Sequence, residues 1–273
     1  MDYCGQVQKL EARLADPVSY FLPLGEQRVA LNPLLGSEVH LRYTGKITCV
    51  HCGRATNKSF NQGYCYPCFQ KLAQCDSCII SPERCHYAAG TCREPVWGDH
   101  FCLQDHIVYL ANSSGLKVGI TRASQVPVRW MDQGATQALA ILRTRTRQQA
   151  GFCEVLLKQH VTDRTNWRNM LKGDSEILDM EAEAQRLLEL CASGLDDIRA
   201  RFGQHAVSRL SGIREVRLNY PVQVQLERLQ SHDLDKEPEL SGPLLGIKGQ
   251  YLMVGERVIN IRKYTGYEIE LGC

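Results

Sequence analysis

Between His106 and Asn166 the chain carries a spaced set of polar side chains that packing alone does not require: Tyr109, Lys117, Arg122, Arg129, Glu154 and Asn166. Cleavage of a phosphodiester needs an activated nucleophile, positive charge near the developing oxyanions and usually a divalent metal ion held by a carboxylate. A phenol, several cations, a carboxylate and an amide supply these groups. The set therefore predicts a site that handles phosphodiesters.

Glu154 is the member of this set with the strongest physical argument. It shares a helical stripe with Ala150, Leu157 and Val161, so its carboxylate is expected to face packed surface. A carboxylate there costs several kcal/mol unless a metal ion or a cation meets it. The sequence leaves two interpretations open: a bound divalent ion, for which we expect Mg²⁺, or an ion pair with Arg129 or Arg122.

The cysteines predict a metal centre. The chain has 13 cysteines, and two Cys-x2-Cys pairs enclose a short loop: Cys49, Cys52, Cys65 and Cys68. Each pair forms a knuckle whose two thiolates converge on one ion, and two knuckles complete a tetrahedral zinc site. An iron–sulfur cluster is the alternative. Because four thiolates leave no open coordination position, we expect a structural role for this site.

A second group of ligand-type residues follows between residues 75 and 106, and it holds more candidates than one ion can use. We take its ligands to be Cys75, Cys78, Cys85 and Cys92, with His86 and Cys102 as the first substitutes. His100 and His106 also remain candidates, and both zinc and an iron–sulfur cluster remain open here.

Composition and charge indicate a folded protein with a basic central region. The chain has 273 residues, 44% hydrophobic and 23% charged, with a formal net charge of +2. Residues 115–172 contain ten Lys and Arg against three acidic residues, whereas residues 174–200 are acidic. The basic region favours a polyanionic partner, or it pairs with the acidic helix beside it. The sequence shows no membrane-spanning segment and no secretory signal, so we expect a cytoplasmic protein whose cysteines bind metal rather than form disulfides.

The elements that must position these residues alternate between strands and helices. We expect strands over 106–111 and 116–121 around a turn, a short helix from Pro127 to Gly134, and a third strand over 139–145. Thr146 and Gln149 form a capping box that opens a helix to about Val161. A further amphipathic helix is expected over 174–192, and short strands over 18–48 and 243–271.

These motifs together resemble a known superfamily. The IVY of 107–109, the KVG of 117–119, Arg129, Glu154 and Asn166 look like the GIY-YIG nucleases, in order and with compatible spacing. The resemblance implies that Glu154 holds Mg²⁺, Tyr109 assists as general base, Arg129 stabilises the phosphate and Asn166 supports the site. The sequence departs from the usual pattern by isoleucine in the first motif and Lys117 in the second, which is similar to a K-[IV]-G branch.

A second resemblance concerns the whole chain: GTCREPVWG, RWMDQGA and GIKGQYL look like an uncharacterised bacterial family of zinc-containing proteins. The fold class expected is α+β, divided into an N-terminal β segment (1–46), a cysteine-rich module (47–104), a GIY-YIG-like core (105–172), a helical linker (173–214) and a C-terminal β module (215–273). The expected function is a divalent-metal-dependent nuclease with structural zinc, acting on nucleic acid, most simply DNA. The alternative is a catalytically inactive, zinc-stabilised nucleic-acid-binding or regulatory protein.

Overall fold

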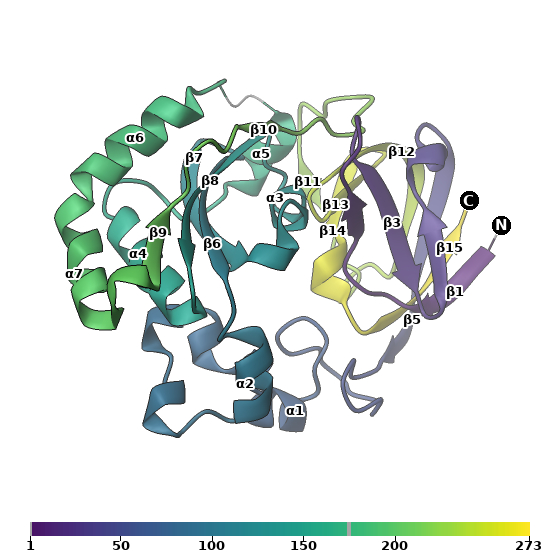
Figure 1. Cartoon of the computed structure of the whole chain (residues 1–273). Coiled ribbons are helices and arrows are strands. Elements are labelled where there is room, and N and C mark those ends of the chain that lie inside the picture. Colours follow the sequence, from purple (N-terminus) through teal and green to yellow (C-terminus); the bar gives the residue numbers. More distant parts are fainter. Residues whose placement is uncertain (1, 174–175) are drawn as a thin grey trace.

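The computed structural model describes residues 2–173 and 176–273. Two β-rich lobes lie side by side, and a smaller module with little regular structure lies below them (Figure 1). Both chain termini belong to the same lobe, where the first and last strands are neighbours. Helices and several sheets occur together, so the α+β prediction is confirmed.

The terminal lobe contains a seven-stranded sheet built from both ends of the chain. Its order is β1 (Asp2–Gln6), β15 (Tyr267–Gly272), β5 (Glu38–Ile47), β12 (Glu239–Lys248), β13 (Tyr251–Val254), β14 (Arg257–Asn260) and β11 (Gln230–Ser231). A three-stranded sheet lies beside it: β2 (Glu11–Arg13), β3 (Ser19–Leu24) and β4 (Gln27–Ala30). The two terminal segments that the sequence suggested as separate modules therefore share one sheet.

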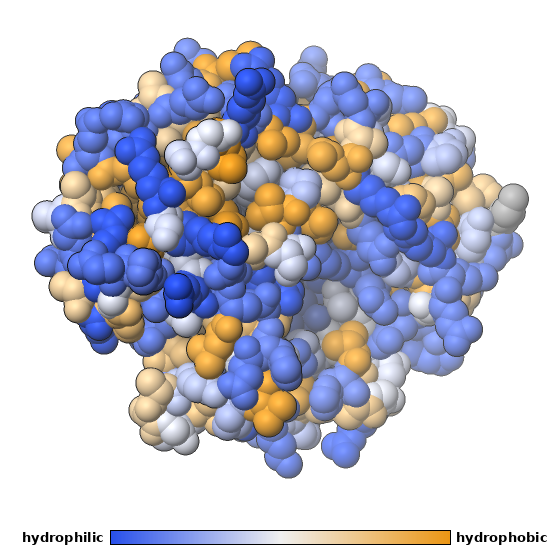
Figure 2. Space-filling model, viewed as in Figure 1, coloured by the Kyte–Doolittle hydropathy of each residue, from blue (hydrophilic) through white to orange (hydrophobic). Residues whose placement is uncertain are grey.

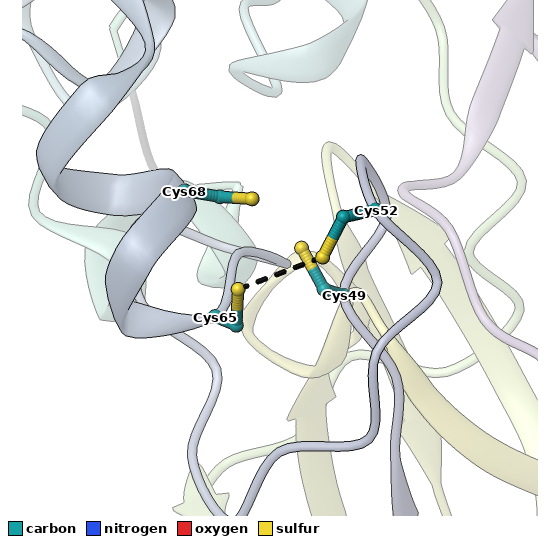
Figure 3. Close-up of side chains that lie close together, drawn as sticks. All are labelled: Cys49, Cys52, Cys65 and Cys68. Atoms are coloured by element: carbon teal, nitrogen blue, oxygen red, sulfur yellow. Dashed lines mark hydrogen bonds between the residues drawn. The ribbon is translucent and has the colours of Figure 1, made fainter.

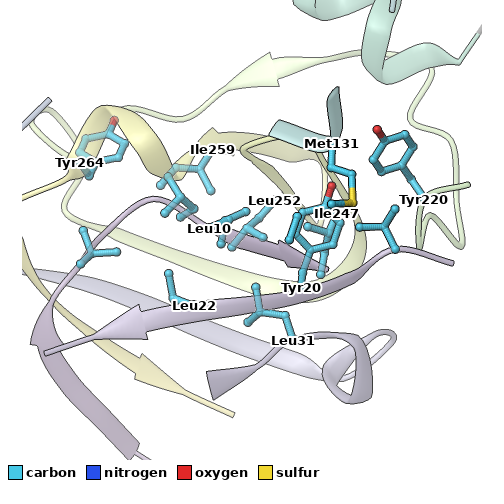
Figure 4. Packing of buried hydrophobic residues seen from close by; sticks show 14 of the residues in the cluster. Leu10, Tyr20, Leu22, Leu31, Met131, Tyr220, Ile247, Leu252, Ile259 and Tyr264 are labelled. Atoms are coloured by element: carbon cyan, nitrogen blue, oxygen red, sulfur yellow. The ribbon is translucent and has the colours of Figure 1, made fainter. Parts of the chain in front are cut away.

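A single apolar core explains why the two terminal segments join. Alternate residues of β3, among them Tyr20 and Leu22, point inward and meet Ile247, Leu252 and Ile259 from the other end of the chain (Figure 4). Neither segment has enough inward-facing residues to bury its own apolar face, and side-chain alternation in a strand leaves that face exposed unless another sheet covers it.

The second lobe contains the predicted strands. Its five-stranded sheet has the order β10 (Val216–Arg217), β8 (Gln137–Thr144), β6 (His106–Asn112) and β7 (Leu116–Arg122), with β9 (Val207–Arg209) also paired to β8. β6 and β7 form an antiparallel hairpin in which Tyr109 lies opposite Gly119. The three central strands agree with the sequence prediction to within two residues at each end.

The helices of this lobe follow the predicted order. They are α3 (Val128–Asp132), α4 (Arg147–Leu157), α5 (Trp167–Lys172), α6 (Met180–Leu190) and α7 (Ala192–Phe202). The capping box of Thr146 and Gln149 is present, but α4 ends four residues before Val161. α6 begins only at Met180, because the Asp179 side chain accepts a hydrogen bond from the backbone N–H of Ala182 and caps the helix there. Ile177 precedes the helix and is exposed, and residues 174 and 175 lie outside the described residues.

The sheet of the second lobe is buried on both faces. Val108 and Leu110 pack under α4, α6 and α7, whereas Ile107, Tyr109 and Ala111 face the core shared with the terminal lobe. The helices α6 and α7, which lie in the segment expected as a helical linker (173–214), thus cover this face of the sheet. The apolar stripe of α6, which includes Ala184 and Leu187, explains why this helix packs rather than spans two domains.

The cysteine-rich module consists mainly of loops and short 3₁₀ turns. It has two helices, α1 (Tyr66–Lys71) and α2 (Pro95–Phe101), and a turn at Pro82–Arg84 that packs on α4. The approach is close: a Cβ on Gly151 of α4 would lie 2.6 Å from the backbone nitrogen of Glu83. Glycine is thus required where the module meets the helix that carries Glu154.

Candidate functional site

The first metal centre is assembled as the sequence predicts. The sulfurs of Cys49, Cys52, Cys65 and Cys68 all lie within 4.8 Å of one another, and those of Cys52 and Cys65 are 3.7 Å apart (Figure 3). A tetrahedral zinc ion with Zn–S bonds of about 2.3 Å has sulfurs roughly 3.8 Å apart. The cluster therefore has the geometry to hold a metal ion such as zinc.

Local backbone geometry favours the thiolate form of Cys49, whereas burial raises the pKa of Cys68 in the same centre. Burial raises the pKa of Cys49, but hydrogen bonds from backbone N–H groups, first of Cys52 and then of Cys65 and His51, outweigh it and lower that pKa to about 6. Gly53 has a φ of +69° in the first knuckle, where its N–H donates to the carbonyl of Cys49. Such knuckles bind metal because the thiolate, rather than the thiol, is the ligand.

The second group of cysteines is arranged differently from the predicted set. Cys75 is buried near Asn61, Arg93 and Cys49, which places it toward the first centre. Cys78, Cys85, Cys92 and Cys102 instead line one small cavity. The structure thus favours Cys102 over Cys75 as a member of this group.

The histidines of this region have separate surroundings. The ring of His86 lies beside Asp76 and Cys78, and the ligand atoms of these three residues are within 4.8 Å of one another. His100 is exposed on α2. His106 is fully buried, and burial lowers its pKa to about 4; its Nδ1 lies 2.7 Å from the carbonyl of Gln104, while its Nε2 has no hydrogen-bond partner among the residues that the structure describes.

Tyr109 lies at the centre of the predicted catalytic set but is inaccessible to solvent. Its hydroxyl donates to Oε1 of Gln133 at 3.0 Å, and a Cβ on the facing Gly119 would lie 2.6 Å from that hydroxyl. Burial raises the pKa of Tyr109, although the nearby Arg129 guanidinium acts in the opposite direction. The neutral phenol is therefore the stable form in this structure, and the KVG glycine is needed to accommodate it.

Lys117 is also nearly buried, with 3% of its surface exposed. Its Nζ donates to the hydroxyl of Thr165 at 2.6 Å. Burial, and next the positive charge of Arg129, lower the pKa of Lys117 to about 8. The charged form of this lysine is therefore disfavoured beside Arg129, and within the described residues Lys117 forms no ion pair.

Glu154 is half-buried on α4, and among the described residues it forms no ion pair. Burial raises the pKa of its carboxyl group, against the opposing charges of Lys158, Arg147 and Arg129. The neighbouring Lys158 is paired instead with Asp163, at 2.7 Å. The ion pair of Glu154 with Arg129 or Arg122, which the sequence left open, is thus not formed.

Arg129 connects these groups. Besides Tyr109, Lys117 and Glu154, its charge reaches two further cations that the sequence analysis did not single out, Arg147 and Arg262. Burial and the Arg129 charge both lower the pKa of Arg262 and of Arg147. We call Tyr109, Lys117, Arg129, Arg147, Glu154 and Arg262 the Arg129 cluster. It contains one carboxylate and four cations, of which Lys117, Arg147 and Arg262 are each repelled by Arg129.

Two predicted site residues lie apart from this cluster. Arg122 stacks on the ring of Phe101, with its guanidinium carbon 4.1 Å from the ring centroid. Asn166 is exposed and caps α5, its side-chain oxygen accepting from the backbone N–H groups of Arg168 and Asn169. Each has a sufficient structural role where it stands.

A recess marks the junction of the two lobes and the cysteine-rich module (Figure 2). A cavity of about 410 Å³ between the terminal lobe and the cysteine-rich module is lined by Lys9, Tyr64 and Arg262, among others. Nε of Arg262 donates to Oε1 of Gln62 at 2.6 Å, which joins the module to the terminal lobe. No local motif marks Arg262; it reaches the cluster only because the chain ends fold back onto the core.

The comparisons with known proteins identify the family. A family model described as "Protein of unknown function (DUF2797)" matches residues 36–269, which is most of the chain, so the protein belongs to the DUF2797 family. No curated protein and no solved structure matches the chain. The matched region includes the cysteine-rich module, the sheet-and-helix core and the C-terminal strands as one unit. Within the described part of the chain, no helix has the length and apolar character to cross a membrane.

Proposed function

We propose that this protein binds nucleic acid through the Arg129 cluster and hydrolyses a phosphodiester with a divalent ion held by Glu154. The observation that carries the proposal is that Arg129 acts on Lys117, Arg147 and Arg262 and on Glu154, which forms no ion pair among the described residues. Cations that repel one another in a half-buried place are costly unless an anion compensates them. A phosphate group is the anion that arginine recognises best.

Four residues of the cluster have a stated chemical role in this proposal. Arg129 and Arg262 bind the phosphate oxygens and stabilise the charge that develops on them. Glu154 is the metal ligand; when bound, a divalent ion such as Mg²⁺ would polarise the phosphate and activate water. Tyr109 is enclosed by Gly119 and bonded to Gln133, so it positions Arg129 and Gln133 and does not act as the general base.

The burial of Tyr109 and Lys117 favours a second candidate, a nucleic-acid-binding or regulatory protein without catalysis. With 0% and 3% of their surfaces exposed, neither side chain reaches a substrate in this conformation. A single carboxylate is also a sparse ligand set for a divalent ion. This candidate keeps the phosphate-binding cations and omits the metal.

Cleavage by the Glu154→Ala variant separates the two candidates. Single-stranded, duplex and branched DNA and RNA oligonucleotides are incubated with the full chain and Mg²⁺ or Mn²⁺, and products are resolved on denaturing gels. Hydrolysis predicts metal-dependent products that fall at least about 100-fold in Glu154→Ala. Glu181→Ala, an exposed carboxylate on α6, is the matched control and should cleave like the wild type.

Oligonucleotide binding measured at low salt tests the nucleic-acid binding that both candidate functions share. Retention of an oligonucleotide by wild type and by Glu154→Ala, without products at any divalent ion, would favour the non-catalytic protein. Absence of retention at low salt would exclude both candidates, because binding by lysine and arginine strengthens as salt falls.

A further inference from the structure

We propose that the chain holds a second metal centre, whose ligands are the thiolates of Cys78, Cys85, Cys92 and Cys102. This centre is separate from the Cys49/Cys52/Cys65/Cys68 cluster and independent of the proposed activity. It differs from the set that sequence spacing suggests, because Cys102 replaces Cys75.

The cavity that these residues line is the main evidence. Cys78, Cys85, Cys92 and Cys102 come from four turns of the module and surround one enclosed space of about 10 Å³. Such a volume is near the smallest that holds one water-sized species. The remaining wall consists of Ala73, Asp76, His86, Tyr87, Trp97 and Gly98, so two polar ligand-type side chains border the space beside the sulfurs.

The wall around the sulfurs is tightly packed: a Cβ on Gly98 would lie 3.6 Å from Sγ of Cys92 and 3.1 Å from the Tyr87 ring. Four thiols gathered in one closed space, without a disulfide between them, are the donor set of a thiophilic metal.

Asp76 and His86 are less suitable ligands, although they lie beside Cys78. The Asp76 carboxylate is 2.8 Å from Nε of Arg93 and accepts a hydrogen bond from the backbone N–H of Cys78. Nδ1 of His86 is 2.8 Å from the Thr91 hydroxyl, and its Nε2 is 3.4 Å from Asp76. Both side chains line the same cavity, but these contacts occupy their polar atoms and orient them to support the Cys78 loop.

The spacing of the sulfurs bears on which metal is bound. Among the described residues, only the first centre brings four sulfurs within 4.8 Å of one another. The second set is wider than a lone zinc ion requires, so side-chain rotation would close it around zinc, whereas an iron–sulfur cluster holds thiolates farther apart. Both groups use four cysteine thiolates, and the experiment below distinguishes them.

The position of Cys102 gives this centre a structural consequence. The carbonyl of Cys102 accepts the backbone N–H of Arg147 at 2.8 Å, and the Arg147 guanidinium donates to the carbonyl of Ile79 at 2.6 Å. The Gln148 amide donates to the carbonyl of Cys85 at 2.9 Å. The loops of the second centre thus hold the first turn of α4, the helix that carries Glu154.

Metal analysis of matched cysteine variants tests the assignment. The full chain and its Cys102→Ser and Cys75→Ser variants are purified without oxygen from medium containing zinc and iron, and bound metal is measured by mass spectrometry. Wild type and Cys75→Ser should carry both centres, whereas Cys102→Ser should retain only the first. Zinc without visible absorbance identifies a single ion; iron with sulfide and a visible band identifies a cluster.

Alkylation of the wild-type protein provides a measurement that does not depend on a variant folding. Cysteines are labelled before and after chelation and located by peptide mass spectrometry. We expect chelation to expose Cys78, Cys85, Cys92 and Cys102 together, while the exposed Cys4 reacts equally in both samples. The proposal is overturned if Cys75→Ser loses the second metal and Cys102→Ser keeps it, or if the wild type binds metal only at the first centre.

Discussion

The first cysteine centre and the Arg129 cluster differ in how far apart in sequence their residues lie. The four sulfurs of the centre come from residues 49–68, and turns with few degrees of freedom bring them together. The Arg129 cluster draws on β6, β7, α3 and α4 and on Arg262 near the C-terminus. One site is closed by local geometry, and the other depends on the docking of two lobes and a module.

The first cysteine centre and the Arg129 cluster also differ in their electrostatics. In the cysteine centre, backbone N–H groups lower the pKa of Cys49 to about 6, although burial raises the pKa of Cys68. In the Arg129 cluster, burial and like charges work against the charged forms of Lys117 and Arg262. Four cysteine sulfurs around one point suit a permanently bound ion, whereas partly buried cations around Arg129 suit an exchangeable anion.

Removal of the first metal should give the largest effect. Cys65→Ser, or chelation, is expected to destabilise residues 47–72 by roughly 5 kcal/mol or more, because structural zinc supplies much of the folding free energy of small modules. Hydrogen exchange measured by mass spectrometry would locate the loss. Cys4→Ser, on β1 and exposed, should leave exchange unchanged. Equal protection in Cys65→Ser and wild type would contradict a structural metal.

Lys117 should make stability depend on pH. Its pKa is about 8 in the folded protein and 10.5 in the reference state. The unfolded chain thus binds more protons between these values, so the free energy of unfolding rises with pH across that range, by about 3 kcal/mol at most. Urea unfolding at pH 8 and pH 10 should show a smaller rise in Lys117→Met.

Lys248 offers a control for this measurement. Burial lowers its pKa to about 8 as well, but Arg129 does not contribute. Arg129→Ala should therefore reduce the pH-dependent rise attributable to Lys117 and leave that of Lys248 intact. An identical rise in wild type and Lys117→Met would show that the lysine is not the titrating group.

Gly119→Ala should destabilise the packing around Tyr109. The added methyl group would meet the Tyr109 hydroxyl at 2.6 Å, and overpacking of this kind costs about 1–3 kcal/mol. Thermal unfolding measures the loss. Gly272→Ala is the control. Like Gly119, Gly272 lies in a strand and has no positive φ, and the atom nearest to its added Cβ would be Oδ1 of Asp2, at 3.3 Å. Equal melting temperatures for the two variants would count against an enclosed Tyr109.

Arg129→Ala should weaken oligonucleotide binding about tenfold, or about 1.4 kcal/mol, and reduce its salt dependence. The physical reason is the loss of one phosphate-binding cation that also repels Lys117 and Arg262. Fluorescence anisotropy at several salt concentrations gives both quantities. Arg186→Ala, a cation already paired with Glu183 on α6, is the control. A salt slope unchanged by Arg129→Ala would place the binding surface elsewhere.

Local features were predictable from the sequence. The capping box of Thr146 and Gln149 fixes the start of α4, and the Cys-x2-Cys spacing alone predicts the first centre. Alternating residues predicted β6, β7 and β8 to within two residues. These predictions succeed because capping hydrogen bonds, turns and the paired ligands of a Cys-x2-Cys motif each involve residues close together in the sequence. The GIY-YIG resemblance and the nuclease function stay predictions.

The long-range features were decided by the tertiary structure. Cys75 and Cys102 are equally plausible ligands by type, and only the path of the chain places Cys102 with Cys78 and Cys85. Arg262 joins Arg129 because both ends of the chain complete one sheet over a shared core. Residue types and short spacings thus set which chemistry was available. Burial and charge, which depend on neighbours distant in sequence, decided that Tyr109 is enclosed, that Glu154 forms no ion pair in the described part of the chain and that Arg129 lies near other cations.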